Sequence, residues 1–191
     1  MVYLSRIYTK TGDDGSTELG DRSRRQKDDL RVAAYGEVDE LNCAVGVATA
    51  HSGDSDIRAV LAAIQHDLFD LGADLCVPGD GEALRITAGQ VERLEREIDR
   101  VNAELGSLDS FVLPGGNMSA ASLHFARAVC RRAERTVVTL RGVEQVNPQA
   151  LIYLNRLSDL LFVLARAANW RTGNPDVLWV PAKNREPGDG Q

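Results

Sequence analysis

The sequence has few cysteines and no recognisable pair among them. Cys43, Cys76 and Cys130 lie far apart in the chain, and no CxxC motif occurs. This pattern argues against a disulfide framework and against a zinc site, and it favours reduced thiols in the cytoplasm. No segment approaches the roughly 20 consecutive apolar residues that a membrane helix requires. Gly12 and Asp13 come too early for a signal peptide, so we expect a cytoplasmic protein that does not contact a membrane.

Basic residues are in the minority. The chain has 22 Lys and Arg against 28 Asp and Glu, which gives a formal net charge of −6. Such a protein is a poor candidate for binding nucleic acid, and a small polyanion would need a local basic pocket. With 191 residues, 43% of them hydrophobic, the chain is long enough for one sizeable core and too short for two. We therefore expect a single domain over residues 1–191.

Sequence signatures of common catalytic sites are also absent. None of the three histidines has a carboxylate three residues before it, which excludes the paired ExxH motifs of a di-iron bundle. The chain contains no GxSxG motif, no HExxH motif and no Cys/His spacing suited to a metal. The sequence therefore predicts neither a nucleophilic triad nor a metal centre held by the protein alone.

Helical periodicity is what the sequence does contain. Between residues 28 and 171, apolar residues recur at spacings of three and four in five successive segments. This pattern predicts an all-α, up-and-down bundle of five helices with a ferritin-like architecture. Residues 1–27 are polar and rich in glycine and are predicted to be loop. Residues 172–191 form a C-terminal tail for which no conformation is predicted.

Two helix starts are marked clearly. Thr87 and Gln90 form a capping-box pattern, and Asn147 followed by Pro148 is typical of a first helical turn. The third helix carries only a narrow apolar stripe among many charges, so it should be the most exposed. The fifth helix, from Leu151 to about residue 171, is apolar nearly all round and should lie centrally.

The fourth helix carries a polar stripe beside its apolar one. His124, Arg127, Arg131 and Glu134 recur at helical spacing and border the core at about 110° from the apolar stripe. These residues suit either a functional site or a solvated face with charge pairs along the helix. On the first helix, Asp39 is a candidate ion-pair partner for one of the arginines of this helix.

The fifth helix places polar residues in an apolar sequence, namely Asn155, Arg156, Asp159 and Arg166. Buried polar groups are costly unless they are paired, so we expect several of these to have partners or a ligand. Hydrogen bonds between helices of the bundle are the structural alternative.

The N-terminal sequence TKTGDDGST is suited to a polyphosphate. Glycines allow backbone N–H groups to converge on anionic oxygens, and Arg6, Lys10 and Lys27 supply positive charge. It is not a Walker A loop, because no GK[ST] closes it and no strand–loop–helix unit surrounds it. A disordered leader rich in Gly and Asp is the alternative. The residues alone thus predict a helical bundle with an anion site.

Three blocks, in order and spanning roughly residues 6 to 170, resemble the PduO-type ATP:cob(I)alamin adenosyltransferases. The blocks are IYTKTGDDGST through KDDLRVAAYGEVDELN, then FVLPGGNMSAASLHFARAVCRRAER, then YLNRLSDLLFVLAR. Departures from the family pattern are small: Leu30 stands where a proline is common and Cys43 where a serine is common. The resemblance implies a homotrimer of five-helix bundles with each active site between two subunits.

The resemblance also implies the site residues. The ATP contacts of the N-terminal segment fall on Thr9, Lys10, Thr11, Gly12, Ser16, Thr17 and Lys27. The ATP contacts of the neighbouring subunit fall on Arg131, Glu134, Arg135 and Asn155. Asp39 and Arg127 match an ion pair between subunits, and Phe111 matches an aromatic residue at the lower face of the corrin. With Arg131, these three form the implied catalytic set.

The implied reaction is a displacement at C5′ of ATP by the cobalt of cob(I)alamin, with triphosphate as the leaving group. Lys10, Lys27 and Arg131, together with Mg²⁺, would neutralise the charge on triphosphate, and Phe111 would displace the lower ligand of cobalt. A flavoprotein reductase and a cobalamin-dependent mutase are implied as partners. Two alternatives stay open: a helical ATP-binding regulator or chaperone that delivers the corrinoid without alkylating it, and a purely structural bundle.

Overall fold

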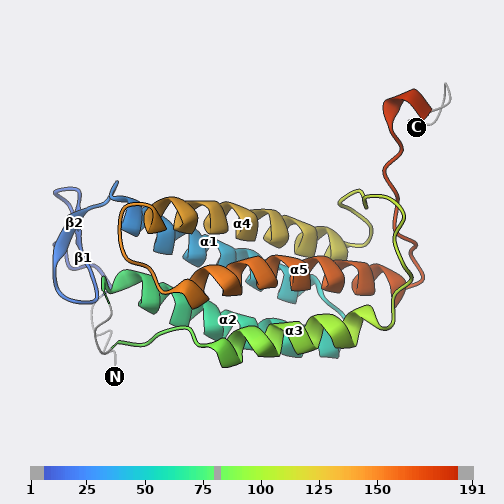
Figure 1. Cartoon of the computed structure of the whole chain (residues 1–191), viewed down its shortest axis with the longest axis horizontal. Coiled ribbons are helices and arrows are strands. Elements are labelled where there is room, and N and C mark those ends of the chain that lie inside the picture. The colour runs from blue at the N-terminus through green and yellow to red at the C-terminus, as the bar shows by residue number, and fades with distance from the viewer. Residues whose placement is uncertain (1–6, 80–82, 185–191) are drawn as a thin grey trace.

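The computed structural model describes residues 7–79 and 83–184 and consists of five long helices preceded by a small β-hairpin (Figure 1). The helices are α1 (Leu30–His51), α2 (Ser55–Cys76), α3 (Ala88–Asn102), α4 (Met118–Arg141) and α5 (Pro148–Trp170). Successive helices run in opposite directions, so the predicted up-and-down bundle is confirmed. The strands are β1 (Ser16–Glu18) and β2 (Arg24–Gln26), which pair antiparallel, and a short 3-10 helix, η1 (Ala182–Asn184), follows α5.

The prediction of loop throughout residues 1–27 is wrong for β1 and β2. Each strand has only three residues, which is too short to show the alternation of apolar and polar residues that marks a strand in sequence. The hairpin is attached to the bundle at Gly20, whose N–H donates to the carbonyl oxygen of Cys76 at the end of α2 (3.3 Å). The N-terminal segment therefore has a defined position at one end of the bundle (Figure 1).

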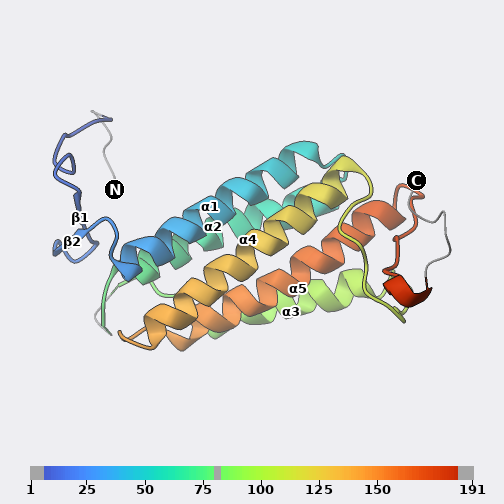
Figure 2. The same ribbon diagram turned by 90° about the horizontal axis from the view of Figure 1, so that it is seen from above.

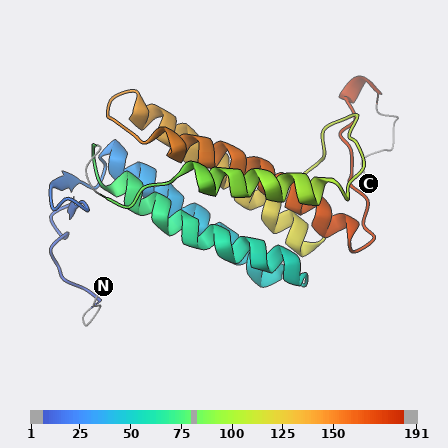
Figure 3. The same ribbon diagram turned by 60° about the horizontal axis from the view of Figure 1, so that its bottom comes forward.

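The helices pack in the order α2, α1, α4, α5 and α3. Seen from above, α4 lies between α1 and α5 (Figure 2), and from below α3 runs along α5 (Figure 3). Most residues of α5 are buried and only three of α3 are, which confirms the predicted central and exposed positions. Although α5 is rich in apolar residues, no helix in the described part of the chain is long and apolar enough to cross a membrane.

Both predicted helix starts are confirmed. The side-chain oxygen of Gln90 accepts a hydrogen bond from the backbone N–H of Thr87 (2.9 Å), as in a capping box. Asn147 caps α5 by accepting from the N–H of Gln149 (3.0 Å), and Pro148 occupies the first turn. The helix thus begins three residues before Leu151.

A buried arginine fixes the start of α1. Arg31 is almost completely buried, and its guanidinium binds the carboxylate of Glu144 and the backbone carbonyls of Leu75 and Gln145. A buried charge is tolerated only when it is paired and hydrogen-bonded. Arg31 therefore connects the end of the hairpin segment to the end of α2 and to the loop between α4 and α5.

Candidate functional site

The predicted phosphate-binding residues lie in one segment before α1, and most of them face solvent. At the end of this segment, Lys27 contacts the turn that contains Gly12. The Nζ of Lys27 donates to the carbonyl oxygen of Gly12 (2.8 Å). A Cβ at Gly12 would lie 2.9 Å from the carbonyl oxygen of Ser16 and 3.2 Å from this Nζ, so the turn requires glycine. Thr9, Lys10, Thr11 and Lys27 are exposed, whereas Ser16 is buried. Arg6 lies outside the described residues.

Arg24 is a residue of this segment that the sequence did not single out. Its guanidinium donates to the carbonyl oxygen of Thr11 (2.7 Å) and to Ser16 Oγ, and it lies 3.6 Å from the carboxylate of Asp14. Hydrogen bonds from the side chain and backbone of Ser16, and then the charge of Arg24, hold the pKa of Asp14 below its usual value. Arg24 thus orders the loop that carries Lys10. One arginine within the run RSRRQK gives no signal of its own.

The second predicted cluster forms between α4 and α5. Glu134 accepts a hydrogen bond from Asn155 Nδ2 (3.0 Å), and the guanidinium of Arg131 lies 3.9 Å from the other carboxylate oxygen of Glu134. Arg135 is exposed and donates to the carbonyl oxygen of Arg131 (3.1 Å). Asn155 and Asp159 are exposed, so the expectation that they are buried in the bundle is wrong. Asn155 nevertheless has a partner on the neighbouring helix, the carboxylate of Glu134 on α4.

One to two turns towards the start of α4, polar atoms of the same stripe are buried and have no hydrogen-bond partner among the described residues. His124 is only 3% exposed, and neither ring nitrogen finds a hydrogen-bond partner among the described residues. The Nε of Arg127 is also buried and unpartnered there. Burial, followed by the charge of Arg127, lowers the pKa of His124, and its ring meets Phe162 of α5 edge-on at 6.1 Å. These atoms are exceptions to the rule that buried polar groups are hydrogen-bonded, so the stripe departs from an ordinary helix interface.

Asp39 lies away from that stripe. It borders a hollow of about 450 Å³ between α1 and α2, beside Phe69, whose side chain is 70% exposed. Across the described ranges, neither Asp39 nor Arg127 forms an ion pair. The arginine of α4 that does meet α1 is Arg132, which contacts Glu40. The structure therefore does not bring Asp39 and Arg127 together within one chain.

Phe111 lies at the opposite end of the bundle from the hairpin. It belongs to the loop between α3 and α4, at the end where α5 finishes (Figure 1). A helix as long as α1, with 22 residues, spans about 33 Å. The side chain of Phe111 is 78% exposed, and its ring meets Trp179 of the tail at 6.2 Å between centroids. Within one chain, Phe111 and Lys27 cannot act on the same reacting centre.

The glycine pair before α4 is held by an asparagine that sequence reasoning missed. Asn169, almost fully buried near the end of α5, accepts a hydrogen bond from the N–H of Asn117 (3.1 Å) and donates to the carbonyl oxygen of Gly115 (3.3 Å). Gly116 has a φ of +99°, and a Cβ there would come within 2.1 Å of Asn169 Oδ1. This contact explains why the PGG sequence carries glycine at its last position.

Comparisons with known proteins agree on one family. Residues 7–168 match the family model for cobalamin adenosyltransferase. A cobalamin adenosyltransferase of Cupriavidus metallidurans is 51% identical over 92% of this chain and 95% of its own length. A corrinoid adenosyltransferase of Mycobacterium leprae is 51% identical over 94% and 98%. A phenylalanine-to-alanine variant of the PduO-type ATP:corrinoid adenosyltransferase from Lactobacillus reuteri, complexed with cobalamin and ATP, superposes with a TM-score of 0.88 at 41% identity, covering 91% of this chain and 99% of that one.

Proposed function

Because the chain belongs to the cobalamin adenosyltransferase family, we propose that its active site is completed where two copies of the chain meet. The protein is a corrinoid adenosyltransferase, which moves the adenosyl group of ATP to the cobalt of a reduced corrinoid. The observation that supports a site shared between two copies is the distance between the segments that carry its proposed residues. Lys27 directly follows β2, and Phe111 belongs to the connection between α3 and α4 at the opposite end of the bundle. A second copy is therefore needed to bring both to the same corrinoid and ATP.

Two different surfaces of the bundle support a head-to-tail assembly. One lies between α1 and α2 and contains Asp39. The other is the polar stripe of α4, where Arg127 forms no ion pair among the described residues and its Nε has no hydrogen-bond partner there. Exposed apolar side chains also occur on both helix pairs, for example Phe69 on α2 and Phe125 on α4. Contacts between two unlike patches generate a ring when the rotation closes, and we propose that the ring is a trimer in which Asp39 of one copy pairs with Arg127 of the next.

The proposed ATP site combines the N-terminal segment of one copy with the α4–α5 cluster of its neighbour. Lys10 and Lys27 would bind the phosphates. The guanidinium of Arg131 is half-exposed and no closer than 3.9 Å to the carboxylate of Glu134, so its N–H donors remain free to bind a phosphate. Glu134 and Asn155 would orient Arg131 and contact the nucleoside. The hydroxyl and carboxylate oxygens of the N-terminal segment fit Mg²⁺ bound to the phosphates, where it would offset negative charge.

In the proposed reaction, the lone pair of Co(I) attacks C5′ of ATP, the C5′–O bond breaks and triphosphate leaves with the electron pair. No proton is transferred, so the protein needs no general base. Lys10, Lys27 and Arg131 would stabilise the charge that accumulates on triphosphate. Phe111 would occupy the lower face of the corrin and exclude a lower ligand, because four-coordinate Co(II) is easier to reduce. The remaining work of the protein is to hold the two substrates in line.

The proposed partner proteins follow from this chemistry. The nucleophile must be generated by reduction, which calls for a flavoprotein or similar electron donor, and the product suits transfer to a cobalamin-dependent mutase. All three cysteines are free thiols, which supports the proposed cytoplasmic location.

A direct assay tests the function. The protein is mixed with ATP, Mg²⁺ and chemically reduced cobalamin, and both the adenosyl–cobalt absorption spectrum and the phosphate products are followed. We expect adenosylcobalamin and triphosphate in equal amounts. Orthophosphate and ADP as main products would contradict the mechanism. Corrinoid binding without any alkylation would instead identify a carrier, and the absence of thermal stabilisation by ATP would identify a structural bundle.

A further inference from the structure

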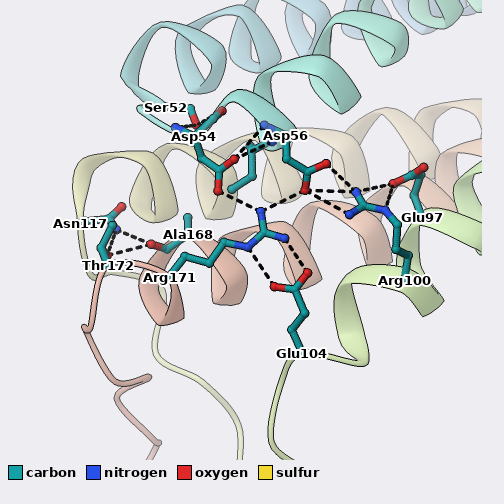
Figure 4. A network of polar contacts seen from close by, with 11 residues as sticks. Ser52, Asp54, Asp56, Glu97, Arg100, Glu104, Asn117, Ala168, Arg171 and Thr172 are labelled. Carbon is teal, nitrogen blue, oxygen red and sulfur yellow. Dashed lines mark hydrogen bonds and ion pairs between the residues drawn. The ribbon is translucent and has the colours of Figure 1, made fainter.

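The segment from residue 103 to residue 117, which we call the Phe111 loop, is held by the C-terminal end of α5 and not by a core of its own. Leu105 near its start packs partly against the core, but Leu108, Phe111 and Leu113 are exposed. Because such a loop buries little apolar surface, polar contacts determine its position. Near its start, Glu104 binds the guanidinium of Arg171 through both carboxylate oxygens (2.7 and 3.0 Å; Figure 4).

The end of the Phe111 loop is held by the same helix terminus. Asn117 donates to the carbonyl oxygen of Ala168 (2.7 Å) and to the hydroxyl of Thr172 (2.8 Å; Figure 4). Both ends of the loop are thus fixed to the last turn of α5 and the residues that follow it. The centre of the loop, which carries Phe111, has no such contact with α5.

The centre is held by the C-terminal tail. The N–H of Trp179 donates to the carbonyl oxygen of Phe111 (2.7 Å), and the N–H of Leu113 donates to the carbonyl oxygen of Val177 (2.8 Å). The hydroxyl of Ser110 donates to the carbonyl oxygen of Trp179 (2.8 Å). These bonds pair residues 110–113 with residues 177–179 as a short antiparallel ladder. The direction of the Phe111 ring therefore depends on where the tail lies.

One buried side chain connects the tail, the loop and the bundle. Arg166 of α5 donates from Nε to the carboxylate of Asp176 (2.7 Å) and from Nη2 to the carbonyl oxygen of Gly106 (2.8 Å). The side chains of Arg166 and Asp176 are only 8% and 15% exposed. Asp176 directly precedes Val177, the first tail residue bonded to the loop, so this ion pair sets the register of the ladder against α5.

We propose that Arg166 is a positioning residue for adenosyl transfer, which acts through Asp176 and the tail to hold Phe111 at the lower face of the corrin. The proposal rests on the function proposed above for Phe111. Arg166 is not proposed to touch substrate; its effect on the reaction passes through its bond to Gly106 of the loop and through Asp176 and the backbone of residues 177–179. The orientation of an exposed aromatic side chain is thereby fixed by a buried ion pair.

The first test compares Arg166→Met with wild type in the full-length protein, with Co(II) cobalamin and ATP. We expect the spectroscopic signal of four-coordinate Co(II) to fall at least several-fold and kcat from Co(II) to fall with it, while KM for ATP stays unchanged. Arg93→Met is the matched control, because Arg93 also pairs with a largely buried carboxylate, that of Asp67, but on α3 and α2. An equal loss of signal in both variants would overturn the proposal.

A double-mutant cycle shows whether Arg166 acts through Phe111. In a Phe111→Ala background, adding Arg166→Met should cause almost no further loss of kcat from Co(II). Losses that multiply would show that the two residues act independently, which overturns the proposal. Arg166→Lys, which keeps the charge but loses the two-pronged geometry, should recover part of the signal.

Cleavage by chymotrypsin after Phe111, measured without ligands by mass spectrometry, tests whether Arg166 holds the loop independently of the proposed role of Phe111 in the reaction. Arg166→Met should be cleaved at this bond several-fold faster than wild type or Arg93→Met. An unchanged cleavage rate would mean that Arg166 does not hold the loop, whatever Phe111 does. Faster cleavage with an unchanged Co(II) signal would contradict the proposed role of Phe111 and, with it, the catalytic consequence of the ion pair.

Discussion

Asp39 of α1 and Arg127 of α4 form no ion pair with each other within the described residues of one chain. Asp39 lies on the side of α1 that faces α2. Arg127 lies on the side of α4 that faces α5, one turn from His124, whose ring meets Phe162 of α5. The chain therefore carries a carboxylate beside one hollow and, on another helix, an arginine that forms no ion pair among the described residues. Two copies related head to tail can bring these groups together, whereas a single chain does not.

If Asp39 and Arg127 pair across subunits, removing one should harm more than removing both. Asp39→Ala or Arg127→Ala strands a charge in the interface at a cost of about 3–5 kcal/mol, whereas the double variant strands none. The measurement is the free energy of trimer dissociation and unfolding in a double-mutant cycle. Simple addition of the two single losses would show that the residues are not paired.

Phe111→Ala should leave ATP binding nearly normal and lower the rate from Co(II) at least tenfold, which is about 1.4 kcal/mol. The reason is that the exposed ring contributes little to the fold but is proposed to exclude the lower ligand of cobalt. Rates from Co(II) and from chemically prepared Co(I) are compared in the same preparation, and Co(I) should show the smaller loss. If Phe111 only fastens its loop, melting temperature would fall while turnover per folded molecule stayed intact.

Gly116→Ala should destabilise the protein by about 1–3 kcal/mol, because a residue with a side chain is strained at positive φ and its Cβ would collide with Asn169. Gly115→Ala is the control: its Cβ meets nothing within 4 Å, and its φ is not in the left-handed region. Denaturant unfolding of both variants gives the comparison. Equal losses would mean that Asn169 moves aside and does not define the turn.

The carboxylates around Arg171 should make the free energy of unfolding depend on pH in the acidic range. Hydrogen bonds with Arg171 lower the pKa of Glu104 below its ordinary 4.5. Burial raises the pKa of Asp54 and Asp56, but hydrogen bonds from Arg171, and at Asp56 from Arg100, outweigh it and lower both below 3.8. Groups with lowered pKa contribute stability above their ordinary pKa and lose it as pH falls through the lowered values.

Arg171→Met should therefore reduce the loss of unfolding free energy between about pH 6 and about pH 3. Urea unfolding at several pH values measures this for wild type and variant. Parallel curves, displaced but equally steep, would mean that Arg171 does not set these pKa values.

The fold could be predicted from sequence because its signals are local. Thr87 with Gln90, and Asn147 with Pro148, mark helix starts through contacts within one turn. The polar stripe of α4 was also visible, since helical spacing alone places Arg131 and Glu134 on one face. Its partner Asn155 was found, but its exposure was predicted wrongly. An apolar helix with a polar stripe looks the same in sequence whether a neighbouring helix or a second copy covers that stripe.

Arg166 was expected to have a partner and has one, but the partners of the anchoring residues could not be predicted, because they are distant in the chain. Arg31 meets Glu144, and Arg166 meets Gly106. In sequence, a buried arginine looks like an arginine on the surface, and only the tertiary structure identifies the group that binds it. Asn169 was hidden for the same reason, since its role depends on the turn that it supports more than fifty residues earlier.

The central claim is that each active site is shared between two copies, and complementation tests it most directly. Lys27→Ala and Arg131→Ala are each expected to be inactive. When the two are unfolded and refolded together, some interfaces in mixed trimers join an intact Lys27 from one chain to an intact Arg131 from its neighbour. Activity should then reappear although neither parent has any. Activity that stays at the parental level, in a sample shown by mass to contain mixed trimers, would contradict the shared site.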